Sequence, residues 1–211
     1  MGEPGVPAIG ARIRAERLRR GVTVRGLARD IGVSASLISQ IETDKSLPSV
    51  STLYAITTAL DIPVEQLFDA VPDGLDEGSA VSPGFAHAIG APPPDRSADA
   101  GPHLCHEDHE ILRLDSGVTW ERLGQLPAKH VDFLLITYQS GATSASRGEL
   151  MRHAGTEYGY LTEGELVLTL GFDEHRMKVG DSVCFDSTTP HGYRNEADVP
   201  AVGVWFVLED T

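Results

Sequence analysis

Long hydrophobic runs are absent from this sequence, and cysteine is rare in it. Only two of the 211 residues are cysteines, Cys105 and Cys184, and they lie far apart. This excludes a disulfide-built scaffold and favours a reducing compartment. No apolar run approaches the roughly 20 residues that a membrane-spanning helix needs, so we expect no membrane partner. The first residues lack a basic stretch followed by an apolar core, so we predict no signal peptide and a cytoplasmic location.

Positive charge is also scarce, with 17 Lys and Arg against 31 Asp and Glu and a formal net charge of −14. Such a chain would repel nucleic acid if the acid were spread evenly. It is not, because residues 1–70 hold eight basic and eight acidic residues, and the whole acidic excess follows them. Residues 11–45 hold eight basic and only four acidic residues. The acidic surplus therefore lies away from the one segment that is suited to approach a polyanion.

Three stretches of the chain differ in pattern. Residues 1–70 show helical periodicity with short breaks. Residues 71–108 are rich in Pro, Gly and Ala and are predicted to be a linker. Residues 109–211 consist of short alternating apolar runs separated by glycines, which is typical of a sandwich or barrel. We therefore predict a multidomain α + β chain, with a helical domain joined by a linker to an all-β domain.

Caps and breakers divide the first domain into five predicted helices. Gly21 ends the first helix, and Gly32 permits a sharp turn between the second and the third. The predicted starts are Ile9 for the first helix, a Thr23 cap for the second, a Ser34 cap for the third (to about Glu42), a Ser49 or Ser51 cap for the fourth, and Pro63 for a fifth through Phe68.

The third helix begins with small polar residues, as a helix that enters a major groove requires. The chain shows the pattern Leu27-Ala28, Gly32-Val33-Ser34, Ile38-Ser39-Gln40-Ile41-Glu42, Pro48-Ser49 and Thr52-Leu53. With this pattern the domain resembles the Cro/repressor-type (Xre family) helix-turn-helix transcriptional regulators. The resemblance implies binding to double-stranded DNA.

The resemblance also implies which side chains meet DNA. The predicted base-reading residues are Ala35, Ser36 and Ser39. Ser34 and Gln40, at the same helix, are also predicted to contact DNA. Phosphate contacts fall to Thr23, Arg25 and Lys45. The alternative is a helical bundle used only for dimerisation, with these serines as ordinary solvated surface.

Two segments of the β domain carry candidate metal ligands. His153 and Glu157 are four residues apart, and a bend at Ala154-Gly155 would bring them together, with His191 joining from a distant strand. Two imidazoles and one carboxylate form a set that suits Fe(II) and also accepts Zn, Mn or Ni.

These segments resemble the two motifs of the cupin family, which implies a double-stranded β-helix (jelly-roll) barrel. The first motif is matched by His153, Glu157 and Gly164, with Gly141 as a more distant leading glycine, and the second by Gly180, His191 and Asn195. Met151 stands where the family has another histidine, so three ligands remain in place of four. The alternative is that the two histidines bind no metal and only hydrogen-bond an effector or each other.

The mouth of such a barrel is the expected small-molecule site. For Tyr138 and Trp205 the alternative is a place in the core, where large aromatic residues are more often found. Asn195 is expected to be structural and to tie the turn after His191. The predicted effector-binding residues are Tyr138, Met151, His153, Glu157, Phe185, His191 and Trp205.

Four further metal-binding residue types lie close together, namely His103, Cys105, His106 and His109. They lack the paired spacing of structural zinc motifs. A solvated loop is the preferred interpretation.

Together these features predict a regulator that is not an enzyme and has no catalytic residues. A homodimer would bind a pseudo-palindromic operator, and a small-molecule effector in the cupin would shift its geometry. The alternative is a mononuclear metal-dependent cupin oxygenase or epoxidase, similar to hydroxypropylphosphonate epoxidase, in which the helices only assemble the oligomer. The recognition helix keeps a DNA-binding form, which favours regulation.

Overall fold

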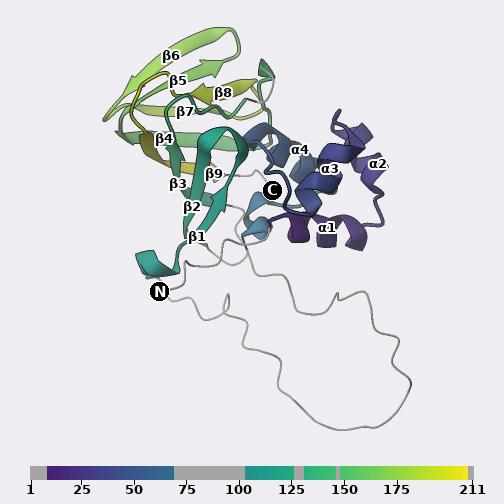
Figure 1. Cartoon of the computed structure of the whole chain (residues 1–211). Helices are drawn as coiled ribbons and strands as arrows, with labels where there is room; N and C mark the ends of the chain where they lie inside the picture. The colour runs from purple at the N-terminus through teal and green to yellow at the C-terminus, as the bar shows by residue number, and fades with distance from the viewer. Residues whose placement is uncertain (1–8, 69–102, 126–130, 146–147, 209–211) are drawn as a thin grey trace, which may run out of the picture.

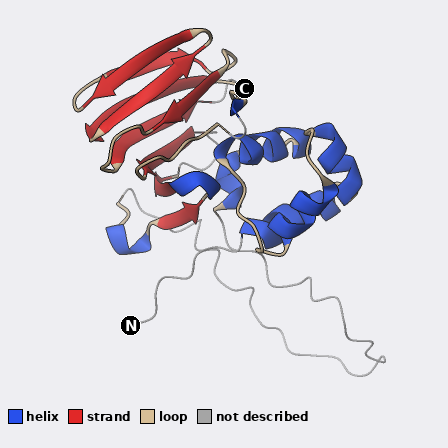
Figure 2. Cartoon of the chain, turned by 45° about the horizontal axis from the view of Figure 1, so that its top comes forward, coloured by secondary structure: helices blue, strands red, loops and turns tan. Residues whose placement is uncertain are grey.

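A computed structural model describes residues 9–68, 103–125, 131–145 and 148–208. The α-helices gather on one side of the molecule and the strands on the other, with short 3-10 turns beside the strands (Figure 2). The predicted linker 71–108 lies mostly outside the described residues. Across these ranges, no helix has the length and apolar character that crossing a bilayer would require.

The N-terminal part contains four α-helices, each begun where the sequence offers a capping side chain or a turn. Thr23 Oγ1 accepts a hydrogen bond from Gly26 N, and Ser34 Oγ accepts one from Leu37 N. Ser49, and not Ser51, caps the fourth helix by accepting from Thr52 N. The helices are α1 (Ile9–Arg19), α2 (Val24–Asp30), α3 (Ala35–Glu42) and α4 (Val50–Leu60).

The fifth predicted helix is wrong: the segment after Pro63 is a single 3-10 turn, η1 (Val64–Leu67). Leu67 and Phe68 are both fully buried, although they are neighbours in sequence. Gln66 N donates to the Pro63 carbonyl at 3.2 Å, which is the three-residue spacing of a 3-10 turn. The Gln66 carbonyl is also held by the Arg12 guanidinium instead of by a further helical turn.

The C-terminal part is an all-β sandwich, as the alternating pattern predicts. A six-stranded sheet has the order β1-β2-β3-β9-β4-β7, and a three-stranded sheet has the order β6-β5-β8, with every pairing antiparallel. Short 3-10 turns precede β1 (η2, His106–Asp108) and β2 (η3, Asp115–Gly117). The strands are β1 (Glu110–Arg113), β2 (Val118–Gly124), β3 (Val131–Tyr138), β4 (Thr156–Glu163), β5 (Glu165–Leu170), β6 (Asp173–Lys178), β7 (Ser182–Asp186), β8 (His191–Arg194) and β9 (Ala201–Leu208).

The motif glycine Gly164 forms the tight turn between β4 and β5. Its φ is +72°, and a Cβ there would lie 2.4 Å from the Pro200 carbonyl oxygen. Only glycine combines this backbone conformation with this close approach.

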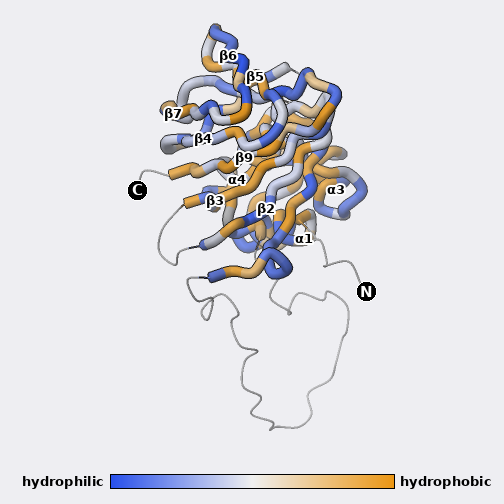
Figure 3. The backbone as a smooth tube through the Cα atoms, turned by 90° about the vertical axis from the view of Figure 1, so that its left-hand side faces the viewer, coloured by the Kyte–Doolittle hydropathy of each residue, from blue (hydrophilic) through white to orange (hydrophobic). Residues whose placement is uncertain are grey.

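Alternate residues of β3, β4 and β9 point inward and line the sandwich. Tyr138, Glu157 and Trp205 are among them, and all three are buried. Helix α4 lies on the side of the helical bundle that faces the strands (Figure 1). Hydrophobic segments of β3, β9 and α4 come together there (Figure 3), and the buried residues of both parts belong to one continuous core.

Candidate DNA-binding face and cupin site

Helices α2 and α3 and the turn between them form the helix-turn-helix. Ser36, Ser39 and Gln40 are exposed on α3, whereas Ile38 and Ile41 are fully buried against the other helices. Ala35 is half-buried at the start of α3. The predicted base-reading residues therefore share the free side of the recognition helix, and the apolar residues hold that helix in place.

The predicted phosphate contacts lie around this face. Arg25 on α2 and Lys45 just after α3 are both exposed. Thr23 and Ser34 are exposed as well, but their side-chain oxygens are engaged as caps of their own helices. Their hydroxyl hydrogens remain available to donate to a phosphate oxygen.

A buried ion pair fixes the recognition helix to α1. Arg17 Nη2 donates to Glu42 Oε2 at 2.8 Å, its Nε donates to the other carboxylate oxygen, and its Nη1 donates to the Val22 carbonyl at 2.8 Å. The hydrogen bond to Glu42 raises the pKa of Arg17. Both side chains are nearly inaccessible, so each charge depends on the other.

In the cupin, the three predicted ligands converge. His153 Nε2 and His191 Nε2 each lie 3.4 Å from Glu157 Oε2, and all three side chains are at most 5% exposed. His153 lies in the segment before β4, Glu157 on β4 and His191 at the start of β8. The bend at Gly155, with φ of +104°, brings the first two together as the sequence predicts.

The two imidazoles are oriented as metal ligands are. His191 Nδ1 lies 2.8 Å from the Thr189 carbonyl and His153 Nδ1 lies 3.2 Å from the Ala154 carbonyl, so both ring N–H groups donate to the backbone. This leaves both Nε2 atoms facing the carboxylate. Within the described residues, neither buried Nε2 atom has a hydrogen-bond partner. A divalent cation would satisfy both nitrogens and Glu157 Oε2 at once, so these residues fit a metal.

A second layer of residues holds the carboxylate. Tyr193 donates its hydroxyl to Glu157 Oε1 at 2.7 Å, and Trp205 Nε1 donates to the same hydroxyl oxygen at 3.1 Å. Burial raises the pKa of Glu157, but the imidazoles of His153 and His191 and the Tyr193 hydroxyl outweigh it and hold the pKa at about 2. Burial and the nearby Glu157 charge raise the pKa of Tyr193. The site therefore contains a carboxylate and a neutral phenol.

Met151 lies beside His191, where the cupin family has its additional histidine. The two residues form an isolated antiparallel bridge, with Met151 N donating to the His191 carbonyl at 2.9 Å and His191 N donating to the Met151 carbonyl at 3.0 Å. Met151 is 7% exposed and lines the site. A thioether is a weak ligand for hard divalent metals, so Met151 adds little to the three ligand atoms.

The structure brings the predicted effector residues to one place. Tyr138, Met151, Glu157 and Trp205 line one small cavity, and the Phe185 ring lies 5.0 Å from His191. Asn195 is structural as expected, because its Nδ2 donates to the Tyr138 and Val199 carbonyls. The sequence interpretation missed several lining residues, among them Trp120 and Tyr193 of the cupin and Val50 and Tyr54 of α4.

The His/Cys cluster before β1 is only partly a solvated loop. His109 Nδ1 lies 2.5 Å and His106 Nδ1 lies 3.2 Å from Glu121 Oε1 on β2, close enough for all three to share an ion. The sequence interpretation did not connect Glu121 to this cluster. His103 and Cys105 are exposed, and the His106 side chain is 87% exposed, so the hydrogen bond between His109 and Glu121 accounts for the arrangement.

Comparison with known proteins agrees with both parts. Residues 13–67 match a helix-turn-helix family model, and residues 134–207 match a cupin domain model. The HTH-type transcriptional regulator PuuR of Escherichia coli (strain K12) is 27% identical over 196 residues, which is 92% of this chain and 91% of PuuR. The uncharacterized HTH-type regulator YazB of Bacillus subtilis (strain 168) is 36% identical over 58 residues, covering 28% of this chain and 84% of YazB.

A crystal structure of an HTH_3 family transcriptional regulator from Vibrio cholerae shares the fold. The two align with a TM-score of 0.63 and 18% identity, over 97% of this chain and 96% of that one. The fold and the site thus define a DNA-binding protein of the helix-turn-helix class with a cupin domain. The chain belongs to the HTH-type (Xre family) transcriptional regulators that carry a C-terminal cupin.

Proposed function

We propose that this regulator is a one-component sensor whose cupin binds a small-molecule effector through a divalent metal held by His153, Glu157 and His191. One observation carries the proposal. Two buried, unpartnered imidazole nitrogens face one carboxylate oxygen, at 3.4 Å each. A buried polar atom without a partner is costly, so such a convergence favours a cation that the three atoms share. Fe, Zn, Mn and Ni all suit this ligand set.

On the DNA side, we propose that a homodimer presents two copies of α3 to a pseudo-palindromic operator. Ala35, Ser36 and Ser39 would read bases, with Ser34 and Gln40 beside them, and Thr23, Arg25 and Lys45 would hold phosphates. The exposure of all these residues except the half-buried Ala35 supports this assignment. The domain boundaries 1–70, 71–108 and 109–211 and the cytoplasmic location remain part of the same proposal.

Two measurements test the function directly. Selection of bound sequences from a random DNA pool should recover a two-fold motif with half-sites about one helical turn apart, or a multiple of it. Metal analysis of protein purified without a His tag should find one divalent ion per chain, and His191→Ala should lose it. A DNA pool without enrichment would contradict the proposed DNA binding. Wild-type protein that takes up no metal would contradict the proposed metal site.

The ligand set also favours a second candidate, because mononuclear iron enzymes use two histidines and one carboxylate. The proposal of a regulator without enzymatic activity is supported by relatives that are named as transcriptional regulators. Oxygen consumption by the iron-loaded protein distinguishes the two: a sensor should consume none beyond the level of the His191→Ala variant.

A further inference from the structure

The cupin site is closed by a residue of the DNA-binding domain. The Tyr54 ring, on α4, stacks on the His153 imidazole with 4.2 Å between ring centroids and 6° between ring planes. Its edge contacts Trp120 on β2, at 5.6 Å between centroids and 60° between planes. Tyr54 is 6% exposed, so it is a buried part of the barrel mouth.

Tyr54 and its neighbour on the same helix face fill the space that an effector needs. Val50 lies one helical turn before Tyr54, and both line the cavity beside Glu157. The free volume left there is about 10 Å³, which is roughly the space of one water molecule. Pockets for organic ligands are commonly about 300–1,000 Å³. An ion fits beside Tyr54, but an organic effector does not.

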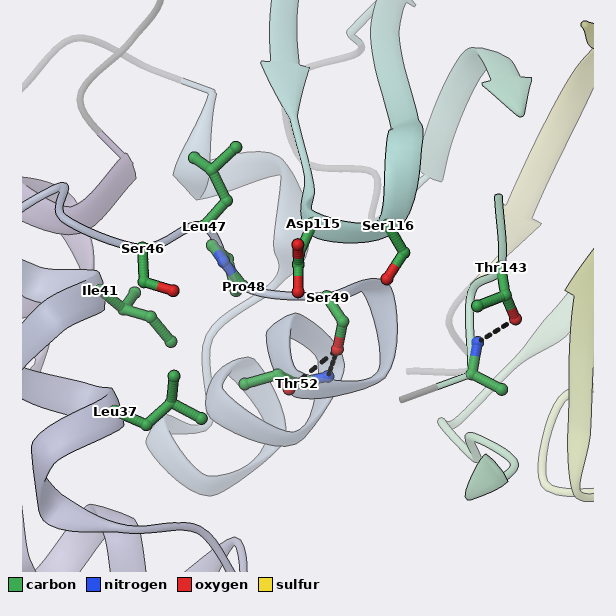
Figure 4. A pocket seen from close by; sticks show the side chains of 11 residues that line it. Leu37, Ile41, Ser46, Leu47, Pro48, Ser49, Thr52, Asp115, Ser116 and Thr143 are labelled. Carbon is green, nitrogen blue, oxygen red and sulfur yellow. Dashed lines mark hydrogen bonds between the residues drawn. The ribbon is translucent and has the colours of Figure 1, made fainter. Parts of the chain in front are cut away.

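The seam that places Tyr54 there joins two parts of the chain that are far apart in sequence. Two backbone hydrogen bonds join the parts near α4, from Ser51 N to the Ser144 carbonyl at 3.2 Å and from Asp115 N to the Pro48 carbonyl at 2.9 Å. Beside them lies a hollow of about 320 Å³ between α3 and α4 on one side and η3 and Thr143 on the other (Figure 4). Protein cores are close-packed, so the seam is open at this edge, while its buried side chains continue the core of both parts.

The length of sequence between the two parts is compatible with a movement. Thirty-four residues of sequence separate Phe68 from His103. A chain of that length can span roughly 100 Å when extended. Displacement of α4 from the barrel therefore breaks no covalent restraint.

From these contacts we infer that Tyr54 is the gate of the sensor. An effector displaces the Tyr54 side chain from the cavity, and the DNA-binding domain then loses its contact with the cupin. The inference rests on the proposed metal and effector site. The cavity walls define the ligand class. Trp120, Tyr138, Trp205 and Val207 are apolar or aromatic, and Glu157 of the candidate ligand set lines the same cavity. The effector is therefore a small organic molecule with an apolar body and one metal-coordinating donor.

This gate explains how an effector bound in the cupin can change DNA binding without covering the recognition helix. Ser36, Ser39 and Gln40 are exposed while Tyr54 is seated. The two states therefore differ in where α3 is held relative to the cupin, and not in whether its reading face is free. In a dimer, such a shift changes the spacing of the two recognition helices, which must match the half-sites.

The test uses Co²⁺ as a spectroscopic metal and imidazole as the metal-coordinating probe. Full-length wild type, Tyr54→Ala and Tyr54→Phe are compared by visible absorption, with Tyr158→Ala as a control that removes an exposed tyrosine from β4. Imidazole should bind Co²⁺-loaded Tyr54→Ala about tenfold more tightly than wild type, because the closed state no longer competes. Tyr54→Phe keeps the stacked ring, so it should titrate closer to wild type than Tyr54→Ala does, and Tyr158→Ala should titrate as wild type does.

The outcomes separate the two proposals. If wild type and Tyr54→Ala both fail to bind Co²⁺, the metal site itself is wrong. If both bind Co²⁺ and take up imidazole equally, the gate is wrong. Should Tyr54→Ala fail to fold, Tyr54→Leu keeps apolar bulk without the stack and should shift the titration in the same direction.

Hydrogen exchange then tests the movement of the domain. Imidazole added to the Co²⁺-loaded wild type should increase amide exchange in α4 (Val50–Leu60), while Co²⁺ alone should not. Unchanged exchange in α4 with imidazole bound would show that the tyrosine turns aside without moving the domain, which overturns the coupling.

Discussion

Met151 and His191 face each other across a two-residue bridge, and each donates its amide to the other's carbonyl. At residue 151 the backbone is therefore paired with His191, as a ligand position beside it requires. Only the side chain of Met151 differs from the histidine of the family pattern. This relationship predicts a gain of function by a single substitution.

Met151→His should place a third imidazole at the site and tighten binding of Zn²⁺ or Ni²⁺ by about tenfold, or about 1.4 kcal/mol of binding free energy. Met151→Leu is the matched control, because it keeps the apolar volume and adds no ligand. Competition with a chromophoric chelator measures both. A histidine variant that binds metal no more tightly than the leucine variant would contradict the placement of residue 151 at the metal.

Tyr193→Phe removes the hydroxyl that donates to Glu157 Oε1 and accepts from Trp205 Nε1. Loss of such an outer contact typically weakens metal binding about 10–100-fold, and we expect a loss in that range. Tyr160→Phe, at an exposed position of β4, is the control and should leave affinity unchanged. The same chelator competition decides it, and equal affinities in the two variants would show that the hydroxyl does not support the ligand.

Ser36→Glu should abolish specific operator binding while the domain stays folded. The residue is exposed near the N-terminus of α3, where a carboxylate is favourable for the helix but would face the bases and phosphates. Thr58→Glu adds the same charge to an exposed position on α4. Gel shifts with a selected operator, together with circular dichroism, test both variants. Normal binding by Ser36→Glu would exclude α3 as the reading helix.

Arg25→Ala and Lys45→Ala should weaken binding to all DNA sequences alike. Each loses one exposed positive charge beside the recognition helix, so the slope of log K against log salt should fall by about 1 for each phosphate contact removed. Fluorescence anisotropy across a salt series measures this slope. A sequence-dependent loss would mean instead that the side chain reads a base.

Arg17→Ala leaves the Glu42 carboxylate buried without its partner. We expect a loss of about 3–5 kcal/mol in the free energy of unfolding of the helical domain. The double variant Arg17→Met with Glu42→Leu removes both charges and should lose much less. Urea unfolding followed by helical circular dichroism compares them, and a double variant as unstable as the single one would show that the pair contributes more than mutual neutralisation.

Local features of this fold were readable from the sequence. The caps at Thr23 and Ser34 depend on residues two or three positions away, and the predicted and observed helix starts agree. His153, Glu157 and His191 were found because the cupin motifs fix their places in the fold. The segment after Pro63 was misjudged because its Gln66 carbonyl is bound by the guanidinium of Arg12, a tertiary contact that overrides a local helix signal.

Tyr54 was missed for a different reason. Leu53, Ile56 and Leu60 recur at helical spacing and are buried, which accounts for the packing of α4 in the bundle without Tyr54. The available signal was that α4 contains no charged residue on any face, which is typical of a helix buried on more than one side. That signal shows that α4 has a second partner, but only the structure shows that the partner is His153 of the cupin.

Tyr54 and His153 belong to one chain, so their contact forms at a local concentration set by the molecule and not by the cell. The fraction of molecules in which Tyr54 contacts His153 therefore does not fall on dilution and does not rise on overexpression. The effector concentration at which such a switch responds would therefore stay the same whether a cell holds few copies of the regulator or many. The two domains would keep a fixed threshold because they are synthesised as one polypeptide.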